Sequence, residues 1–122
     1  MKVLAINGSA RKNGNTAKMI ETLLAELTAE GIETEHVQLA GKDLRGCLAC
    51  YKCFETKDKK CIQKKDLVNE LIEKMDAADG VVLGSPTYFA NVTSNMKSLI
   101  DRAGLVSIAN GRIFARKVGA AV

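Results

Sequence analysis

All four cysteines of the chain lie between positions 47 and 61. Cys47, Cys50 and Cys53 are each separated by two residues, and Cys61 follows after seven more. Three thiols at this spacing share one tight loop, and the fourth lies within reach of them. The double three-residue step matches the first part of the bacterial ferredoxin spacing, in which successive thiolates hold different corners of a [4Fe–4S] cube. The pattern therefore predicts a redox or metal site built from these four residues.

The residues alone leave the kind of cysteine site open. Structural zinc usually takes two separated pairs of ligands, and stable disulfides are uncommon in a cytosolic chain. The proline that usually follows the last ferredoxin ligand is missing. Residues 41–66, a basic and cysteine-rich loop, carry the whole net charge of +4, which would offset the negative charge of a cluster with four thiolates. A [4Fe–4S] cluster is thus favoured over free or redox-active thiols, and both are favoured over zinc.

A second group of residues could hold a phosphate. Residues 7–16 read Asn-Gly-Ser-Ala-Arg-Lys-Asn-Gly-Asn-Thr and precede an expected helix, whose free N–H groups and dipole favour an anion. The loop lacks the G-x-G-x-x-G dinucleotide pattern, and Asn15 stands where a Walker A loop has lysine. A monophosphate held by Ser9, Thr16, backbone amides and Arg11 remains. The plainer alternative is an ordinary turn with Asn15 as the helix cap.

A third group could cover a flat ring. Pro86, the only proline, is followed within three residues by Tyr88 and Phe89. Alone, these aromatic residues would more often belong to a core or an interface. Beside a phosphate loop, a rigid turn with exposed aromatics offers backbone hydrogen bonds and apolar cover to a planar cofactor. The only histidine, His36, lies far from these loops and is given no role.

Hydrophobic patterns predict the elements that position these groups. Nearly unbroken apolar runs at 2–6 and 81–83 are typical of buried parallel strands, 32–39 is typical of an edge strand, and 117–122 reads as a fourth strand. Helices are expected over about 16–30, from an Asp66 cap to about 78, and from Thr93 or Ser94 to Gly104. This alternation predicts an α/β, doubly wound, three-layer parallel sheet, which binds ligands beyond the carboxyl ends of its strands.

Length and composition set the limits of the fold. A chain of 122 residues that is 47% hydrophobic suits one domain over residues 1–122. The fourth strand has no following helix, so we expect the chain to be incomplete at its C-terminus. No apolar run reaches the length of a membrane span and no signal peptide is evident, which favours the cytoplasm. Aromatic residues make up only 4%, which argues against a nucleic-acid surface.

Three segments together carry a family resemblance. Gly8–Thr16 fits G-S-x-R-x-x-G-N-T, Gly84–Tyr88 fits G-[ST]-P-x-Y, and Met96–Arg102 fits M-K-x-[FL]-[IL]-D-R. Through these motifs the chain resembles the flavodoxin-like NAD(P)H-dependent FMN reductases, and the resemblance spans its whole length. The resemblance implies a single FMN-binding domain with residues 41–66 as an insertion. It also implies that Ser9, Arg11, Asn15 and Thr16 face the FMN phosphate, while Pro86, Thr87, Tyr88 and Phe89 border the isoalloxazine.

Within that family, the cysteine spacing resembles the compact motif of the iron–sulfur flavoproteins, whose cluster exchanges electrons with FMN, often across a dimer interface. Some relatives keep several of these cysteines without a cluster. The resemblance implies FMN, NAD(P)H as the electron donor, a homo-oligomer of two or more chains and a redox protein as a partner. It also implies a [4Fe–4S] cluster on Cys47, Cys50, Cys53 and Cys61, with free thiols and zinc as the alternatives.

Two functions follow from these expectations. The first is an oxidoreductase in which the flavin ring accepts hydride or single electrons, so that no catalytic side chain is needed. The alternative is an electron carrier with FMN and a cluster, which meets protein partners through the basic loop and has no substrate of its own. A flavodoxin-like module with thiols or zinc and a vestigial flavin site is the third reading.

Overall fold

The computed structural model describes residues 1–122 and contains one parallel sheet of four strands. The strands are β1 (Lys2–Asn7), β2 (Glu33–Gln38), β3 (Gly80–Gly84) and β4 (Val118–Ala121), in the order β2-β1-β3-β4. All three pairings are parallel, and β1 aligns Lys2 with Glu33 of β2 and Val3 with Gly80 of β3. The order places β1 and β3 at the centre and β2 at an edge, as the hydrophobic patterns predict.

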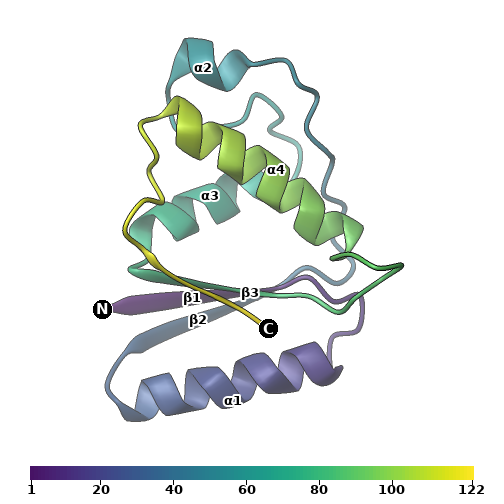
Figure 1. The fold of residues 1–122 in the computed structure, drawn as a ribbon, viewed down its shortest axis with the longest axis vertical. Coiled ribbons are helices and arrows are strands. Elements are labelled where there is room, and N and C mark those ends of the chain that lie inside the picture. Colours follow the sequence, from purple (N-terminus) through teal and green to yellow (C-terminus); the bar gives the residue numbers. More distant parts are fainter.

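Helices cover both faces of the sheet (Figure 1). Helix α1 (Asn15–Ala29) packs on one face, and α3 (Val68–Ala77) and α4 (Ser94–Ala109) pack on the other. The short helix α2 (Lys52–Thr56) lies beyond α4, away from the sheet, and contacts α4. The predicted three-layer, doubly wound α/β fold is therefore confirmed. No helix combines the length and the apolar composition that crossing a membrane requires.

The alternating side chains of β1 explain its apolar sequence. Val3 and Ala5 pack with Ile20 of α1, whereas Leu4 and Ile6 belong to a larger cluster with residues of α3 and α4. Both faces of the strand are buried, so neither set of side chains needs to be polar. At the opposite edge from β2, all four residues of β4 are exposed.

Three details of the helices differ from the sequence-based expectation. Helix α4 does not end at Gly104 but continues to Ala109, because Val106 and Ala109 extend its buried face and outweigh a glycine penalty of about 1 kcal/mol. The cap position of α3 is Leu67 rather than Asp66, although Asp66 Oδ1 accepts the N–H of Val68 at 3.3 Å. Helix α2 lies within the basic loop, where the sequence pattern predicts no helix.

Gly84 lets α1 approach the end of β3. A Cβ at this position would lie 2.6 Å from Ile20 Cδ1 and 2.9 Å from Thr16 Cγ2. Gly84→Ala is therefore expected to overpack this contact and to lower the free energy of unfolding by about 1–3 kcal/mol. Chemical denaturation measures the change, with Gly119→Ala of β4 as the control, because a Cβ there meets nothing within 4 Å. Equal stability of the two variants would contradict the close packing described here.

Candidate cofactor sites

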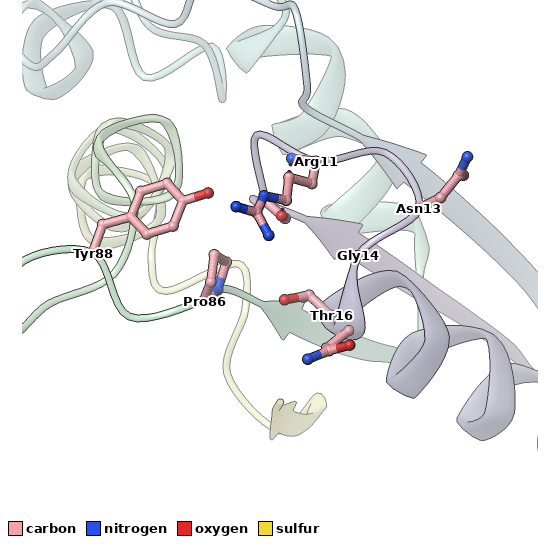
Figure 2. A pocket seen from close by; sticks show the side chains of 8 residues that line it. Arg11, Asn13, Gly14, Thr16, Pro86 and Tyr88 are labelled. Carbon is pink, nitrogen blue, oxygen red and sulfur yellow. Dashed lines mark hydrogen bonds between the residues drawn. The ribbon is translucent and has the colours of Figure 1, made fainter.

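A cavity of about 590 Å³ lies beyond the carboxyl ends of β1 and β3. It brings together six of the eight residues predicted to bind the cofactor and adds two that were not among them. The predicted ones are Ser9, Arg11, Asn15, Thr16, Pro86 and Tyr88, and the additional ones are Asn13 and Gly14. Figure 2 shows the loop residues on one side of the cavity and Pro86 and Tyr88 on the other, with Arg11 and Tyr88 facing each other. The second and third groups of residues, those predicted to hold a phosphate and to cover a flat ring, thus line one cavity.

The start of α1 supplies the features that favour an anion. Gly14 occupies the cap position, no side chain accepts a hydrogen bond from the first turn, and this turn contains no acidic residue. Asn15 is the first helical residue rather than the cap. The first N–H groups and the positive end of the helix dipole are therefore uncompensated, with the Arg11 side chain at the same cavity. A phosphate fits this arrangement.

Local hydrogen bonds shape the loop before α1. Asn7 Oδ1 accepts the N–H of Ser9 at 2.9 Å, and Ser9 Oγ accepts the N–H of Arg11 at 3.1 Å. Ser9 and Thr16 are buried, so their hydroxyl groups are largely shielded from water. The Nδ2 atom of Asn7 is buried and has no hydrogen-bond partner. Buried donors are normally satisfied, so a free donor at the base of this loop fits a site that takes a polar ligand.

The loop is also fixed to its neighbours. The N–H of Gly8 donates to the carbonyl oxygen of Gly84 at 2.7 Å, and Thr93 Oγ1 donates to the carbonyl oxygen of Gly8 at 2.8 Å. A Cβ on Gly8 would lie 3.0 Å from Met96 atoms, so the glycine permits α4 to approach. Thr93 also caps α4 by accepting the N–H of Met96. The phosphate loop is therefore tied directly to the start of α4.

The aromatic loop after β3 ends in a tight turn. Tyr88 and Asn91 exchange backbone hydrogen bonds, and the two residues between them, Phe89 and Ala90, have φ angles of 43° and 65°. Both central residues are left-handed, as a two-residue reverse turn of this type requires. The Phe89 side chain is fully exposed at the tip, and Thr87 is exposed. Of the four residues predicted to border a ring, only Pro86 and Tyr88 line the cavity.

A second, smaller pocket of about 20 Å³ is lined by all four cysteines. The thiols come from the loop around α2 and from the segment before α3, and the remaining lining residues are mostly apolar. These residues are Leu48, Tyr51, Ile62, Gln63, Arg102, Leu105 and Val106. Cys53 and Cys61 are half-buried, whereas Cys47 and Cys50 are exposed. Residues 47–61 thus bring every thiol of the chain to the lining of one pocket.

Backbone winding and burial shape this thiol cluster. Four non-glycine residues of the loop have positive φ angles, namely Ala49, Tyr51, Lys57 and Lys59. The left-handed region costs roughly 1–2 kcal/mol for such residues, so the surrounding contacts must hold the loop in its tight conformation. Burial, followed by the neighbouring Cys61 and Cys50, raises the pKa of the Cys53 thiol above its ordinary value.

Four cysteine thiols can bind either a zinc ion or a [4Fe–4S] cluster. No three cysteine, histidine or acidic side chains converge as the ligands of one metal ion. This arrangement gives no support to tetrahedral zinc, in which all four sulfurs surround a single atom. A [4Fe–4S] cube takes its four thiolates at separate irons and suits a soft, apolar pocket that contains no carboxylate. Four thiols in a lining without carboxylates are therefore the donor set that such a cluster takes.

Arg102 joins α4 to both ends of the cysteine loop. Its side chain is 0% exposed, and its Nη1 atom pairs with Asp66 Oδ2, whose side chain is 6% exposed. Nη1 and Nη2 also donate to the carbonyl oxygens of Arg45 and Gln63, each at 3.0 Å. Neighbouring residues of α4 thus behave differently, since Asp101 pairs with Lys97 on the same helix whereas Arg102 forms a buried, long-range pair.

The buried pair predicts acid sensitivity. Burial raises the pKa of Asp66, but the hydrogen bond from Arg102 and the N–H groups of Arg45 and Val68 together hold it below its ordinary value. A lowered folded-state pKa gives stability that is present above the unfolded-state pKa of about 3.9 and is lost as the pH falls through the folded-state value. Asp66→Asn should lower the free energy of unfolding by about 3 kcal/mol at pH 7, because it leaves the buried positive charge of Arg102 without a negative partner.

Denaturation at several pH values tests this prediction. The loss of stability below about pH 4 should be smaller in Asp66→Asn than in the unmodified protein. Asp43→Asn, an exposed change on the same loop, serves as the control and should retain the original pH profile. Matching profiles for all three proteins would show that the pair with Arg102 does not contribute to stability.

Helix α4 connects the two sites but keeps them apart. Its cap, Thr93, holds the phosphate loop, and Arg102 lies beside the cysteines. Thr93 and Arg102 are nine positions apart, which corresponds to a rise of about 13 Å along a helix. Figure 1 shows the same separation, with α2 at one end of α4 and the start of α1 near the other. Substitutions at one site therefore need not disturb the other.

Comparison with known proteins adds to this geometry. The sequence pattern of the family described as NADPH-dependent FMN reductase matches residues 1–122. An iron–sulfur flavoprotein of Methanocaldococcus jannaschii is 43% identical over 122 residues, which are 100% of this chain and 61% of that protein. An iron–sulfur flavoprotein of Archaeoglobus fulgidus is 40% identical over 113 residues, which are 93% of this chain and 54% of that protein. The chain thus spans little more than half the length of these relatives.

A solved structure gives a comparison at the level of the fold. RosB, determined with bound 8-demethyl-8-formylriboflavin-5′-phosphate, has a TM-score of 0.62 and 25% sequence identity. The match covers 82% of this chain and 40% of RosB.

Proposed function

The chain belongs to the NADPH-dependent FMN reductase family. We propose that it binds FMN in the cavity after β1 and β3 and that it functions as an NAD(P)H-dependent oxidoreductase. We further propose that Cys47, Cys50, Cys53 and Cys61 hold a [4Fe–4S] cluster that exchanges electrons with the flavin. Residues 1–122 then form one flavin-binding domain, and residues 41–66 are its cluster-binding insertion.

One observation carries the flavin proposal. The uncapped start of α1 and the side chains of Ser9, Arg11 and Thr16 meet Pro86 and Tyr88 at a single cavity. A dianionic phosphate beside an apolar, partly aromatic wall is the chemistry of FMN, and a cavity of about 590 Å³ is within the usual range for a bound small molecule. RosB, a solved structure of similar fold, contains a bound riboflavin-5′-phosphate derivative, which supports the same assignment.

In this proposal the protein's own residues bind FMN and orient its ring. Bound FMN supplies hydride and single-electron transfer at its ring. The N–H groups of the first turn of α1, with the hydroxyl groups of Ser9 and Thr16, hold the phosphate and so fix the position of the attached ring. Pro86 and Tyr88 limit that position from the other wall, and no side chain has to act as a general acid or base. Thr87 and Phe89 do not line the cavity, and their contact with the flavin ring stays a prediction.

A comparison of FMN with riboflavin tests the role of the phosphate. Because riboflavin lacks the group that the loop would hold, its dissociation constant is expected to be about 100-fold higher than that of FMN. Quenching of flavin fluorescence on titration into the intact protein measures both constants. Equal affinities would refute the phosphate site, and no quenching by FMN at micromolar concentrations would refute flavin binding altogether.

The electron carrier remains a second candidate because of the loop surface. Leu48, Tyr51 and Ile62 are exposed beside the cysteines, and Lys64 and Lys65 line a neighbouring pocket together with Leu48 and Ile62. Exposed apolar residues next to basic ones suit an acidic redox protein. Steady NAD(P)H oxidation with bound FMN would favour the enzyme, whereas a reduced state that discharges only to an added acidic carrier such as flavodoxin would favour the second function.

We also propose a homo-oligomer that works in the cytoplasm. The proposal of self-association is supported by large exposed apolar side chains, of which Phe89 is the most exposed. The proposed compartment is supported by four cysteines that remain unpaired as thiols.

A further inference from the structure

We propose that Arg102 is the positioning residue of the cysteine site: its buried guanidinium holds the Cys61 sulfur in place and, by donating an N–H to that sulfur, raises the reduction potential of the cluster. The inference rests on the proposed cluster but goes beyond its four ligands. It assigns a function to a side chain that does not line the flavin cavity.

The contact geometry singles out one sulfur. Arg102 Nε lies 3.3 Å from Cys61 Sγ, within the distance of an N–H···S hydrogen bond. The backbone of Cys61 is fixed separately from α3, where Asn69 Oδ1 accepts its N–H at 2.7 Å and Asn69 Nδ2 donates to its carbonyl oxygen at 2.9 Å. Two helices therefore hold the residue, with α3 fixing its main chain and α4 fixing its sulfur.

The guanidinium itself has little freedom to move. Asp66 and the carbonyl oxygens of Arg45 and Gln63 accept its other N–H groups, and the side chain is 0% exposed. Arg45 and Gln63 flank the cysteine segment, so the same group joins the two ends of the loop. Because three other acceptors hold the guanidinium of Arg102, its Nε atom already points at Cys61 before a cluster binds. Little conformational entropy of this side chain is therefore lost on cluster binding.

The electrostatic consequence has a definite direction. Hydrogen bonds to cluster sulfurs and nearby positive charge stabilise the reduced state, which carries one more electron. The buried location of Arg102 strengthens this effect, because water does not screen the charge. The Cys61 corner should therefore be easier to reduce than an apolar environment alone would make it.

Arg102→Lys separates this hydrogen bond from the buried charge. The ammonium can still pair with Asp66, but it lacks the planar fork that reaches Cys61, Arg45 and Gln63 together. We expect the variant to form a cluster with a more negative reduction potential and to lose iron to a chelator faster than the unmodified protein. The double variant Arg102→Gln/Asp66→Asn removes both charges, should shift the potential in the same direction, and replaces the single variant if that one does not fold.

Asp101→Asn is the matched control. It lies next to Arg102 on α4 and removes only an exposed pair with Lys97, so potential and iron retention should stay unchanged. Dye-monitored titration with dithionite gives the cluster potential, and chelator competition gives the rate of iron loss. An unchanged potential in the substituted proteins would overturn the inference, even if iron incorporation fell, because lower incorporation alone reflects a structural role.

A measurement on the unsubstituted protein tests the contact directly. When arginine is labelled with ¹⁵N, pulsed EPR of the reduced cluster is expected to show a ¹⁵N hyperfine coupling, and the absence of this coupling would overturn the inference. If the unmodified protein holds no iron and sulfide after anaerobic purification and reconstitution, the proposed cluster itself fails. That outcome is distinct from a cluster that forms but whose reduction potential does not change when Arg102 is substituted.

Discussion

Cys50→Ala is expected to remove the iron and acid-labile sulfide of the protein while FMN affinity stays within about twofold of the original value. Cys50 is exposed and lies among the thiols at the far end of α4 from the phosphate loop. The loss of one of four thiolates leaves one iron without its protein ligand. The exposed position also means that the substitution removes little buried surface, so the fold should be retained.

Iron and sulfide analysis after anaerobic purification gives the first result, and flavin titration of the same sample gives the second. Glu55→Gln of α2 is the matched control, because it changes an exposed residue of the same loop and removes only a surface pair with Lys52. Iron content should be unaffected in this control. If Cys50→Ala weakens FMN binding as strongly as it depletes iron, the two sites are not separate as proposed.

The sequence was sufficient to predict the sheet and most of the residues that gather in the two pockets, because their signals are local. Unbroken apolar strands, a polar loop before a helix and a regular cysteine spacing can each be recognised within about ten residues. The order β2-β1-β3-β4 follows from parallel crossovers between such units. Local reasoning also placed Ser9 and Thr16 at the same cavity as Tyr88, since the carboxyl ends of neighbouring parallel strands meet.

The buried contacts of Arg102 could not be predicted in this way. Its partner Asp66 lies 36 positions earlier and its sulfur contact lies 41 positions earlier, so both contacts are too distant in the sequence for local patterns to indicate them. One signal was present, because Arg102 follows Leu99 by three positions and precedes Val106 by four, which places a charge on the apolar face of the helix. A charged residue on such a face is buried only when it is paired.

Thr16→Val is expected to raise the dissociation constant for FMN by about 10-fold or more. The hydroxyl of this buried residue lies at the phosphate end of the cavity, and a hydrogen bond to a charged group contributes about 1.5–3 kcal/mol. Valine replaces the hydroxyl with a methyl group and keeps the Cγ2 atom that packs near Gly84. The change in affinity should therefore not come from a loss of packing between α1 and β3.

Two comparisons decide whether the effect belongs to the phosphate. Thr22→Val makes the same chemical change on an exposed turn of α1, where the hydroxyl donates only to the carbonyl oxygen of Lys18, so FMN affinity should be unchanged. Riboflavin should bind Thr16→Val and the original protein equally weakly, because it lacks the group that Thr16 would contact. A penalty of the same size for riboflavin and FMN would mean that Thr16 affects the shape of the cavity, and the helix start would lose its assignment as the phosphate site.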